Sequence, residues 1–361
     1  MDTNKLVEQL GRLVELRTLP GDTLANAKAL DYVETLVDKK VIKERFTNGN
    51  AEVLILSVNK TYTPEICYMV HMDVVAGRDD QFKMEVDGDR LVGRGTCDMK
   101  FSIPVGIALL NKAIKNGLDF AMVITTDEET GGLDGGKYLA DIKGYAPKLL
   151  IVPDGGVNLN FVDRTKGVCQ LKIVATGAAA HASRPWLGEN ALEMIVELAH
   201  ELKKEYHEDN IKEGWATTMN IGTINGGIST NQVCPSAEMK IDFRYPETDS
   251  VEKIVEKVKK MIDKVPGKFE VTVIGTGLPT FTDVLDVRVE RYIKIMAETF
   301  GREILVKPNH GASDARHFAP LNIPVIMHKP LGGEIHSDNE WVSLSSVATF
   351  YTGLSNYLGL K

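Results

Sequence analysis

The chain has 361 residues, 43% of them hydrophobic and 25% charged, which is typical of a soluble globular protein and long enough for two domains. It has 42 lysines and arginines against 50 aspartates and glutamates, so the net charge is −8, which argues against nucleic acid and anionic membranes as partners. No apolar run approaches the roughly 18 residues that a membrane span requires.

The start of the chain, MDTNKLVEQLGRLVEL, has the pattern of a charged amphipathic helix rather than of a signal peptide. The four cysteines, Cys67, Cys97, Cys169 and Cys234, are scattered and form no CxxC pair. We therefore expect a cytoplasmic protein with reduced thiols and no cysteine metal cluster.

Short apolar strands alternate with helices along the first part of the chain. The pattern predicts helices over 4–19 and 26–38, strands over 51–58 and 65–73, a helix over 101–117, a strand over 119–126, a short helix over 135–143 and a strand over 148–154. After residue 280 the same pattern predicts a helix near 286–300, strands in REILV and IPVIMH, and a final helix from about 344. Such alternation indicates an α/β fold with a mainly parallel, doubly wound sheet.

Between these two parts the order of elements changes. The pattern predicts a strand over 167–177, a helix over 190–206, strands over 215–226 and 237–246, a helix over 250–265 and a strand over 268–275. This β-α-β-β-α-β order is that of a ferredoxin-like α+β unit. We therefore predict one α/β domain, made of residues 1–165 and 279–361, that is interrupted by a ferredoxin-like domain over residues 166–278.

Nitrogen and oxygen donors follow several of the predicted parallel strands at the point where each strand ends. His71 and Asp73 end one strand, Glu128 and Glu129 follow another, and Asp154 follows a third. Sites in open α/β sheets form at the carboxyl ends of the strands, so these side chains are expected to share one edge.

Two further donors, Asp98 and His336, lie in loops that contain glycine and can approach the same edge. Each donor alone has a simpler interpretation, because a lone histidine is usually a satisfied hydrogen-bonding group, an aspartate before a helix is usually a cap, and a glutamate pair is usually a solvated turn. Their joint occurrence favours a site.

A pair of divalent ions about 3.5–4 Å apart explains this set of side chains, because the ions offset the repulsion among the carboxylates. One glutamate of the pair can bind metal while the other accepts a proton from water. Asp73 lies two residues beyond His71, on the same face of the strand, and can hold the second imidazole nitrogen.

The chain resembles the aminoacylase, carboxypeptidase G and succinyl-diaminopimelate desuccinylase family of co-catalytic zinc metallopeptidases. The resemblance covers nearly the whole chain and is carried by HMD, GRGTCDMK, TTDEETGG, PDGG, GAAAHASRPWLGENALE, NQVCPSAEMKIDFRYP, GASDARHF and IHSDNEW. It implies a metal-bearing α/β domain interrupted by a ferredoxin-like dimerisation domain, and therefore a homodimer.

The resemblance also implies a role for each matching residue. One metal ion is expected on His71, Asp98 and Asp154, and the other on Asp98, Glu129 and His336, with Asp98 bridging. Glu128 is expected to be the general base, Asp73 to orient His71, and His181 to reach the active site of a neighbouring subunit and steady the oxyanion. The polar groups expected to hold the substrate are Asn231, Arg244 and Arg316. The cofactors are expected to be two divalent ions per chain, Zn²⁺ first, with Co²⁺ or Mn²⁺ as alternatives.

Two positions depart from the family pattern. Phe101 stands where the family usually has glycine, beside Asp98 but without a chemical role. Asp154 stands where deacylases and desuccinylases usually carry glutamate, whereas the peptidase branches carry aspartate there. This weakly favours a peptide bond as the target.

The expected activity is hydrolysis of an amide bond in small peptides or N-acylated amino acids with a free carboxylate, with a peptidase slightly favoured. Two alternatives stay open at this point. One is an N-acyl-amino-acid deacylase or desuccinylase. The other, from a different class, is a non-catalytic amino-acid or peptide binding protein that kept the fold.

Overall fold

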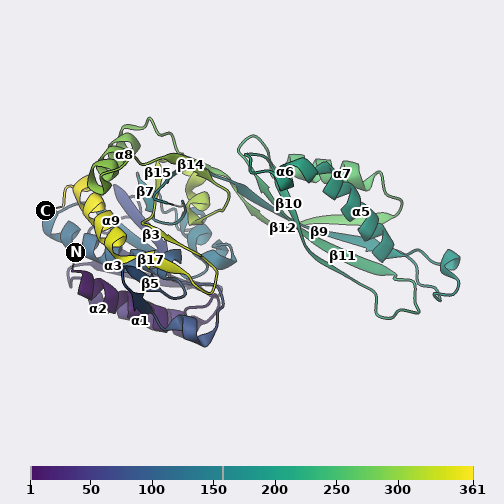
Figure 1. Cartoon of the computed structure of the whole chain (residues 1–361), viewed down its shortest axis with the longest axis horizontal. Coiled ribbons are helices and arrows are strands. Elements are labelled where there is room, and N and C mark those ends of the chain that lie inside the picture. The colour runs from purple at the N-terminus through teal and green to yellow at the C-terminus, as the bar shows by residue number, and fades with distance from the viewer. Residues whose placement is uncertain (1, 157, 361) are drawn as a thin grey trace. The chain divides into compact units, whose positions relative to one another are not determined.

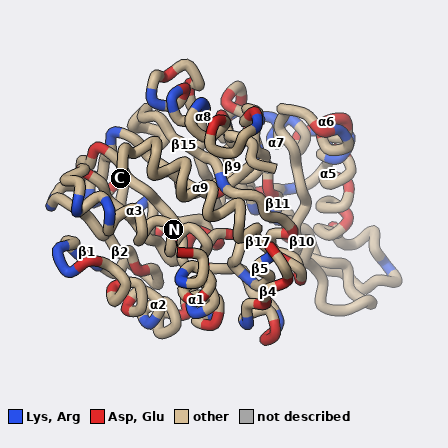
Figure 2. Tube along the Cα trace, turned by 60° about the vertical axis from the view of Figure 1, so that its left-hand side comes forward, with Lys and Arg blue, Asp and Glu red and all other residues tan. Residues whose placement is uncertain are grey.

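The computed structural model describes residues 2–156 and 158–360. The chain divides into two compact units, Met1–Arg164 with Phe281–Lys361, and Thr165–Thr280. No helix among the described residues is long and apolar enough to cross a membrane. Lysines and arginines are interspersed with aspartates and glutamates along the chain (Figure 2), so the acidic excess is spread over many elements.

The first unit carries the larger sheet and most of the helices (Figure 1). Before the interruption its elements are α1 (Thr3–Glu15), α2 (Thr23–Leu36), β1 (Ile42–Asn48), β2 (Ala51–Ser57), β3 (Ile66–His71), β4 (Glu85–Asp87), β5 (Arg90–Val92), α3 (Ser102–Asn116), β6 (Phe120–Thr125), α4 (Tyr138–Asp141), β7 (Leu150–Val152) and β8 (Phe161–Thr165). After it come β13 (Thr280–Phe281), α8 (Val287–Phe300), β14 (Val306–Asn309), β15 (Val325–Met327), β16 (Gly332–Gly333), β17 (Trp341–Ser343) and α9 (Leu344–Tyr357).

The large sheet is mixed rather than mainly parallel. Its order is β1-β2-β6-β3-β7-β15-β8-β13, with β14 paired to β8. The central strands β6, β3, β7 and β15 are parallel to one another, whereas the pairs β1–β2, β2–β6 and β15–β8 are antiparallel. The α/β class is confirmed, and the parallel part lies at the centre, where the carboxyl ends of the strands meet.

Alternating side chains of the strands fill two hydrophobic layers, one on each face of this sheet. In β2, for example, Leu54 and Leu56 pack with α1, α2, α3, α8 and α9, whereas Val53 and Ile55 pack with α4 and the helical turn Asp314–Leu321. The period of two that separates the faces is that of a strand. Each buried aliphatic side chain contributes roughly 1.5–3 kcal/mol, so the sheet is held firmly between its two layers.

Helix α3 fixes the loop that carries Asp98. It begins directly after the helical turn Thr96–Lys100 and ends at Gly117, whose φ of +64° closes the helix in a left-handed cap. Its residues Ile103, Ile107 and Leu110, spaced three and four apart, are buried against the sheet. The turn that precedes α3 is thereby attached to the core.

The second unit is a ferredoxin-like α+β fold. Its elements are β9 (Gly167–Thr176), α5 (Ala191–Glu205), α6 (His207–Ile211), β10 (Thr218–Gly226), β11 (Ser236–Tyr245), α7 (Val251–Ile262) and β12 (Lys268–Gly277). The antiparallel sheet has the order β10-β11-β9-β12. Figure 1 shows α5 and α7 on one side of this sheet, where they pack on buried residues of β9 and β11.

Candidate metal centre

Three strands of the large sheet deliver polar side chains to one edge. β3 ends at His71, which lies opposite Thr125 at the end of β6, and β7 is the parallel neighbour of β3 on its other side. Glu128 and Glu129 follow β6 in the helical turn Glu128–Thr130, and Asp154 follows β7. The strand register therefore explains why these side chains, distant in sequence, lie close together.

In the described parts of the chain, two groups of side chains could each hold a metal ion. One contains His71, Asp98 and Asp154, and the other contains Asp98, Glu129 and His336; within each group the donor atoms lie within 4.8 Å of one another. The structure thus brings together all five side chains that the sequence predicted as metal ligands. Their roles stay predictions.

Asp98 lies between the two groups and faces them with different oxygens. Its Oδ1 is 3.3 Å from Nε2 of His71, and its Oδ2 is 3.2 Å from Nε2 of His336. Nε2 of His336 is also 3.2 Å from Oε2 of Glu129. A carboxylate in this position has the geometry of a bridging ligand.

The residues present fit a pair of divalent cations. Oε1 of Glu129 is buried and has no hydrogen-bond partner among the described residues, although a buried carboxylate oxygen normally has one. Hydrogen bonds to Asp98 and Glu129 raise the pKa of His336 to about 10. These two carboxylates therefore attract positive charge at the place where a metal ion would lie. Imidazole and carboxylate donors suit Zn²⁺, Co²⁺ and Mn²⁺.

Asp73 forms hydrogen bonds both with His71 and with the turn that carries Glu128 and Glu129. Its backbone carbonyl, not its carboxylate, is the hydrogen-bond partner of His71 Nδ1, at 2.9 Å, and its Oδ1 lies 3.6 Å from the same nitrogen. The carboxylate accepts the backbone N–H groups of Glu128 and Glu129 at 3.2 and 2.9 Å. The sequence predicted only the contact with His71, because the partners in the turn lie 55 and 56 residues further along the chain.

Glu128 belongs to neither donor group, although it lies next to Glu129 in the same turn. Burial raises the pKa of its carboxyl well above the ordinary value, and His71 opposes this shift. A carboxylate that is close to metal ligands without being one of them is suited to accept a proton.

Glu340 holds the loop that carries Asp98, and the sequence analysis did not single it out. Its buried carboxylate accepts hydrogen bonds from the backbone N–H groups of Gly95, Cys97 and Asp98 at 3.0, 3.0 and 2.9 Å. It also accepts one from the buried guanidinium of Arg94 at 2.9 Å. The only signal in the sequence was its place four residues after His336.

Arg316, a predicted substrate-binding residue, lies in the turn Asp314–Leu321 of the first unit. Its Nη2 donates to the backbone carbonyl of Gly131 at 2.7 Å, directly after the turn that carries the glutamate pair. The guanidinium therefore supports this turn.

The other predicted residues lie in the second unit and have local contacts there. Nδ1 of His181 is 2.8 Å from Oγ of Ser183, and the carbonyl of Asn231 accepts the N–H of Ala182 at 2.9 Å. Arg244 donates to Asp242 at 2.6 Å. Asn231 and His181 therefore share one corner of this unit, and the catalytic and binding roles of all three residues stay predictions.

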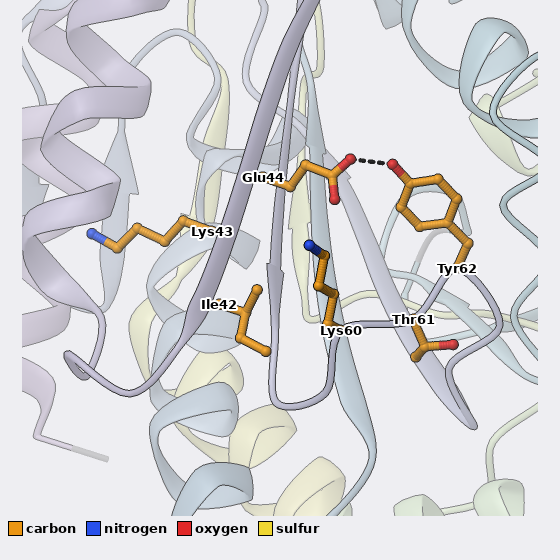
Figure 3. Close-up of a pocket in the computed structure, with 6 residues that line it drawn as sticks. All are labelled: Ile42, Lys43, Glu44, Lys60, Thr61 and Tyr62. Carbon is orange, nitrogen blue, oxygen red and sulfur yellow. Dashed lines mark hydrogen bonds between the residues drawn. The ribbon is translucent and has the colours of Figure 1, made fainter.

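A surface hollow at the edge strand β1 contains none of the predicted site residues. It is lined by Ile42, Lys43, Glu44, Lys60, Thr61 and Tyr62. Figure 3 shows the Tyr62 hydroxyl donating to the Glu44 carboxylate, while the Lys43 side chain points to the other side of the strand. The hollow is thus formed by ordinary side chains of an edge strand and is separate from the metal centre.

Comparison with known proteins finds one matching family model and several relatives. Residues 164–270 match the peptidase dimerisation domain of the M20 group. The chain is 24% identical to succinyl-diaminopimelate desuccinylase of Rickettsia massiliae over 91% of its own length and 93% of that protein. It is 25% identical to the desuccinylase of Shewanella pealeana, over 80% of each chain.

Solved structures share the fold over almost the whole chain. A tripeptidase from Staphylococcus aureus superposes with a TM-score of 0.79 at 19% identity, over 99% of this chain and 98% of the other. An M20 family metallo-carboxypeptidase from Sulfolobus solfataricus has a TM-score of 0.79 at 18% identity, over 100% and 99%. At these identities the likeness establishes the fold. Together with the sequence relatives, it confirms the resemblance predicted from the motifs.

Proposed function

We propose that this hydrolytic metalloenzyme, a relative of the M20 metallopeptidases, cleaves an amide bond in small peptides or N-acylated amino acids that carry a free carboxylate. The observation that carries the proposal is Asp98, whose two oxygens face two donor groups, with the free carboxylate of Glu128 beside them. A binding protein would not need a spare carboxylate at this place.

The proposed cofactors are two divalent ions per chain, with Zn²⁺ favoured. His71, Asp98 and Asp154 would hold one, and Asp98, Glu129 and His336 the other. When bound, such a pair polarises the carbonyl of the amide and lowers the pKa of a water molecule.

The chain's own side chains would perform the proton transfers. Glu128 accepts a proton from the attacking water at its carboxylate and then gives it to the departing amine, because it is the carboxylate that metal binding leaves free. Asp73 keeps Glu128 in position by accepting the N–H groups of the turn. His181 of the second unit donates to the oxyanion that forms at the carbonyl, and does so in the active site of a second copy.

Asn231, Arg244 and Arg316 would hold the substrate. An arginine fork binds a carboxylate directionally, which suits a substrate with a free terminal carboxylate. The buried, unpaired cysteines of the described chain support the expected cytoplasmic location, where thiols stay reduced.

A peptidase and a desuccinylase are both supported, by different observations. Asp154, in place of glutamate, favours peptides, and the two similar solved structures described above are peptidases. The relatives in sequence are named desuccinylases, which favours an N-succinyl amino acid.

A substrate screen separates the two. Dipeptides and the N-acetyl, N-succinyl and N-formyl derivatives of the same amino acids are offered with zinc, manganese or cobalt, and release of the free amine is measured. We expect dipeptides to be cleaved faster than the acyl derivatives. Faster release from N-succinyl amino acids would select the desuccinylase, and no release from any compound with any metal would contradict the proposed function.

A further inference from the structure

A buried lysine that neither the sequence analysis nor the proposed mechanism uses lies beside one of the donor groups. Lys329 follows β15, which pairs in parallel with β7 so that Met327 lies opposite Val152. Two residues beyond these partners come Lys329 on one strand and Asp154 on the other. The same strand pair therefore brings an ammonium group and a predicted metal ligand to the same edge of the sheet.

Lys329 is only 6% exposed and lies close to acidic side chains of the metal centre. Burial alone lowers the pKa of its ammonium, but Cys97, Asp98, Asp154 and Glu340 together raise it above the ordinary value. The carboxylates that interact electrostatically with Lys329 include Asp98 and Asp154, two members of the His71–Asp98–Asp154 group. The fold thus places a lysine ammonium close to two ligands of the same donor group.

A structural role through direct contacts does not account for Lys329. No hydrogen bond or ion pair joins its ammonium to any residue that the structure describes. Lys100, which is also buried near the centre, differs in this respect, because its Nζ donates to the carbonyl of Leu13 at 2.8 Å. An ammonium group without a direct partner in the protein acts on its neighbours mainly through its charge.

We propose that Lys329 makes the two metal positions unequal, by weakening cation binding at the His71–Asp98–Asp154 position relative to the Asp98–Glu129–His336 position. The reason is repulsion between the ammonium and a divalent cation across a poorly solvated interior. The two positions then fill in order, with the His336 position first, and full activity depends on the free metal concentration. This inference rests on the proposed two-metal site.

The test isolates each metal position before the charge is removed. His336→Ala leaves the His71–Asp98–Asp154 position as the intact one, and Asp154→Asn leaves the other. Lys329→Met, which keeps the length of the side chain without its charge, is added to each background. Zn²⁺ affinity of the metal-free proteins is measured by competition with a chromophoric chelator, so the result does not depend on activity.

We expect Lys329→Met to tighten Zn²⁺ binding in the His336→Ala background by on the order of 10-fold or more, and by much less in the Asp154→Asn background. Lys329→Arg keeps the charge and should leave the affinity low. Lys166→Met is the matched control, because Lys166 is a buried lysine of the second unit whose Nζ also lacks a hydrogen-bond partner. It should change neither affinity.

Unchanged affinity in both backgrounds, or an equal gain in both, would overturn the inference while leaving the two-metal site intact. Failure of the wild-type protein to bind Zn²⁺ at all would instead overturn the proposed function, and this inference with it. If metal-free Lys329→Met does not stay folded, the metal-loaded His336→Ala protein with and without Lys329→Met is mixed with excess chelator. Slower Zn²⁺ release from the variant supports the inference, and an equal rate overturns it.

Discussion

Glu128 and Glu129 are neighbours in one turn, yet their surroundings differ. Oε2 of Glu129 lies 3.2 Å from His336, within a donor group, whereas Glu128 belongs to neither group. The backbone N–H groups of both are held by the same carboxylate, that of Asp73. Glu129 is therefore the expected metal ligand and Glu128 the expected proton acceptor, and substitution of each can test these roles.

We predict that Glu128→Gln keeps its metal ions and loses about 10²–10⁴-fold in turnover, because the amide cannot accept the proton. Glu129→Gln should instead lower the metal content, because it removes a charged ligand. Metal analysis and steady-state rates on the same preparations check both. Equal metal contents and equal losses of turnover would mean that the two roles are assigned wrongly.

A buried histidine outside the metal centre makes the stability of the fold depend on pH. The ring of His328 is enclosed, with Nδ1 2.9 Å from the hydroxyl of Tyr292 and Nε2 3.1 Å from the carbonyl of Leu159. Burial lowers its pKa from 6.5 to about 4, and the contact with Leu159 opposes this shift only partly. The folded protein therefore holds this imidazole neutral.

The direction of the pH effect follows from proton binding in the two states. Between pH 6.5 and pH 4 the unfolded chain binds a proton at His328 that the folded chain does not, so stability falls as the pH falls through this window. The full effect is on the order of 3 kcal/mol. We predict that the pH dependence of the unfolding free energy, measured with denaturant, becomes shallower below pH 6.5 in His328→Gln. Parallel curves for the two proteins would contradict the assignment.

At the scale of the elements, the loop between β5 and α3 depends on a residue from the end of the chain. Glu340, next to β17, receives the N–H groups of Gly95, Cys97 and Asp98 and pairs with Arg94. Both side chains of the ion pair are almost fully buried, at 1% and 3% exposed. Asp98 is therefore positioned by a partner more than 240 residues away in sequence.

We predict that Glu340→Gln lowers the unfolding free energy by about 3–5 kcal/mol, because Arg94 is left as an uncompensated buried charge. Metal affinity should fall by roughly 10–100-fold as the Asp98 loop loosens, an effect typical of partners that orient ligands. Glu85→Gln, at an exposed position in β4, is the control and should change neither quantity. If Glu340→Gln binds metal as tightly as the wild type, the loop is fixed by something else.

The predictable elements are those whose pattern is local. The ends of β3, β6 and β7 carry His71, the glutamate pair and Asp154, and period and composition alone indicated both the strands and the edge where they meet. Helices α8 and α9 begin within a residue of their predicted starts. Three of the five predicted ligands, His71, Glu129 and Asp154, come together for the same reason, since parallel strands end at one edge. Asp98 and His336 reach this edge from loops.

Other features depend on contacts that a local pattern does not contain. The small sheet β16-β17-β5-β4 joins strands of two or three residues from opposite ends of the chain, too short for an alternation to be visible. β1 was not predicted, because its run of Lys43, Glu44 and Arg45 has the composition of an exposed edge strand. The strand expected in REILV begins later, at β14. Lys329 and Glu340 could not be singled out from the sequence, because the residues that they lie close to are distant along the chain.

At the scale of the whole molecule, the second unit (Thr165–Thr280) is the part expected to pair with a second copy of the chain. Residues 164–270 match a peptidase dimerisation domain, and His181 lies within that stretch, whereas the metal-ligand candidates lie in the other unit. An open antiparallel sheet can also offer an edge strand to a symmetry mate. We therefore expect a homodimer in which each chain lends His181 to the site of the other.

Mixing two inactive variants tests this arrangement. His181→Ala should keep its metal and lose on the order of 10²–10³-fold in turnover, as removal of an oxyanion donor does. When it exchanges subunits with Glu128→Gln, a mixed dimer contains one site with both defects and one with neither, so activity should return. Mixed dimers that form, as shown by differently tagged chains, yet remain inactive would mean that His181 does not act across the interface.

The central claim is that two metal ions share Asp98 and act together. The most direct measurement adds Zn²⁺ stepwise to the metal-free protein and follows bound metal and amide hydrolysis in the same samples. We predict saturation at two ions per chain, with full activity only after the second ion is bound. Saturation at one ion per chain, with activity complete at that point, would contradict the shared role of Asp98.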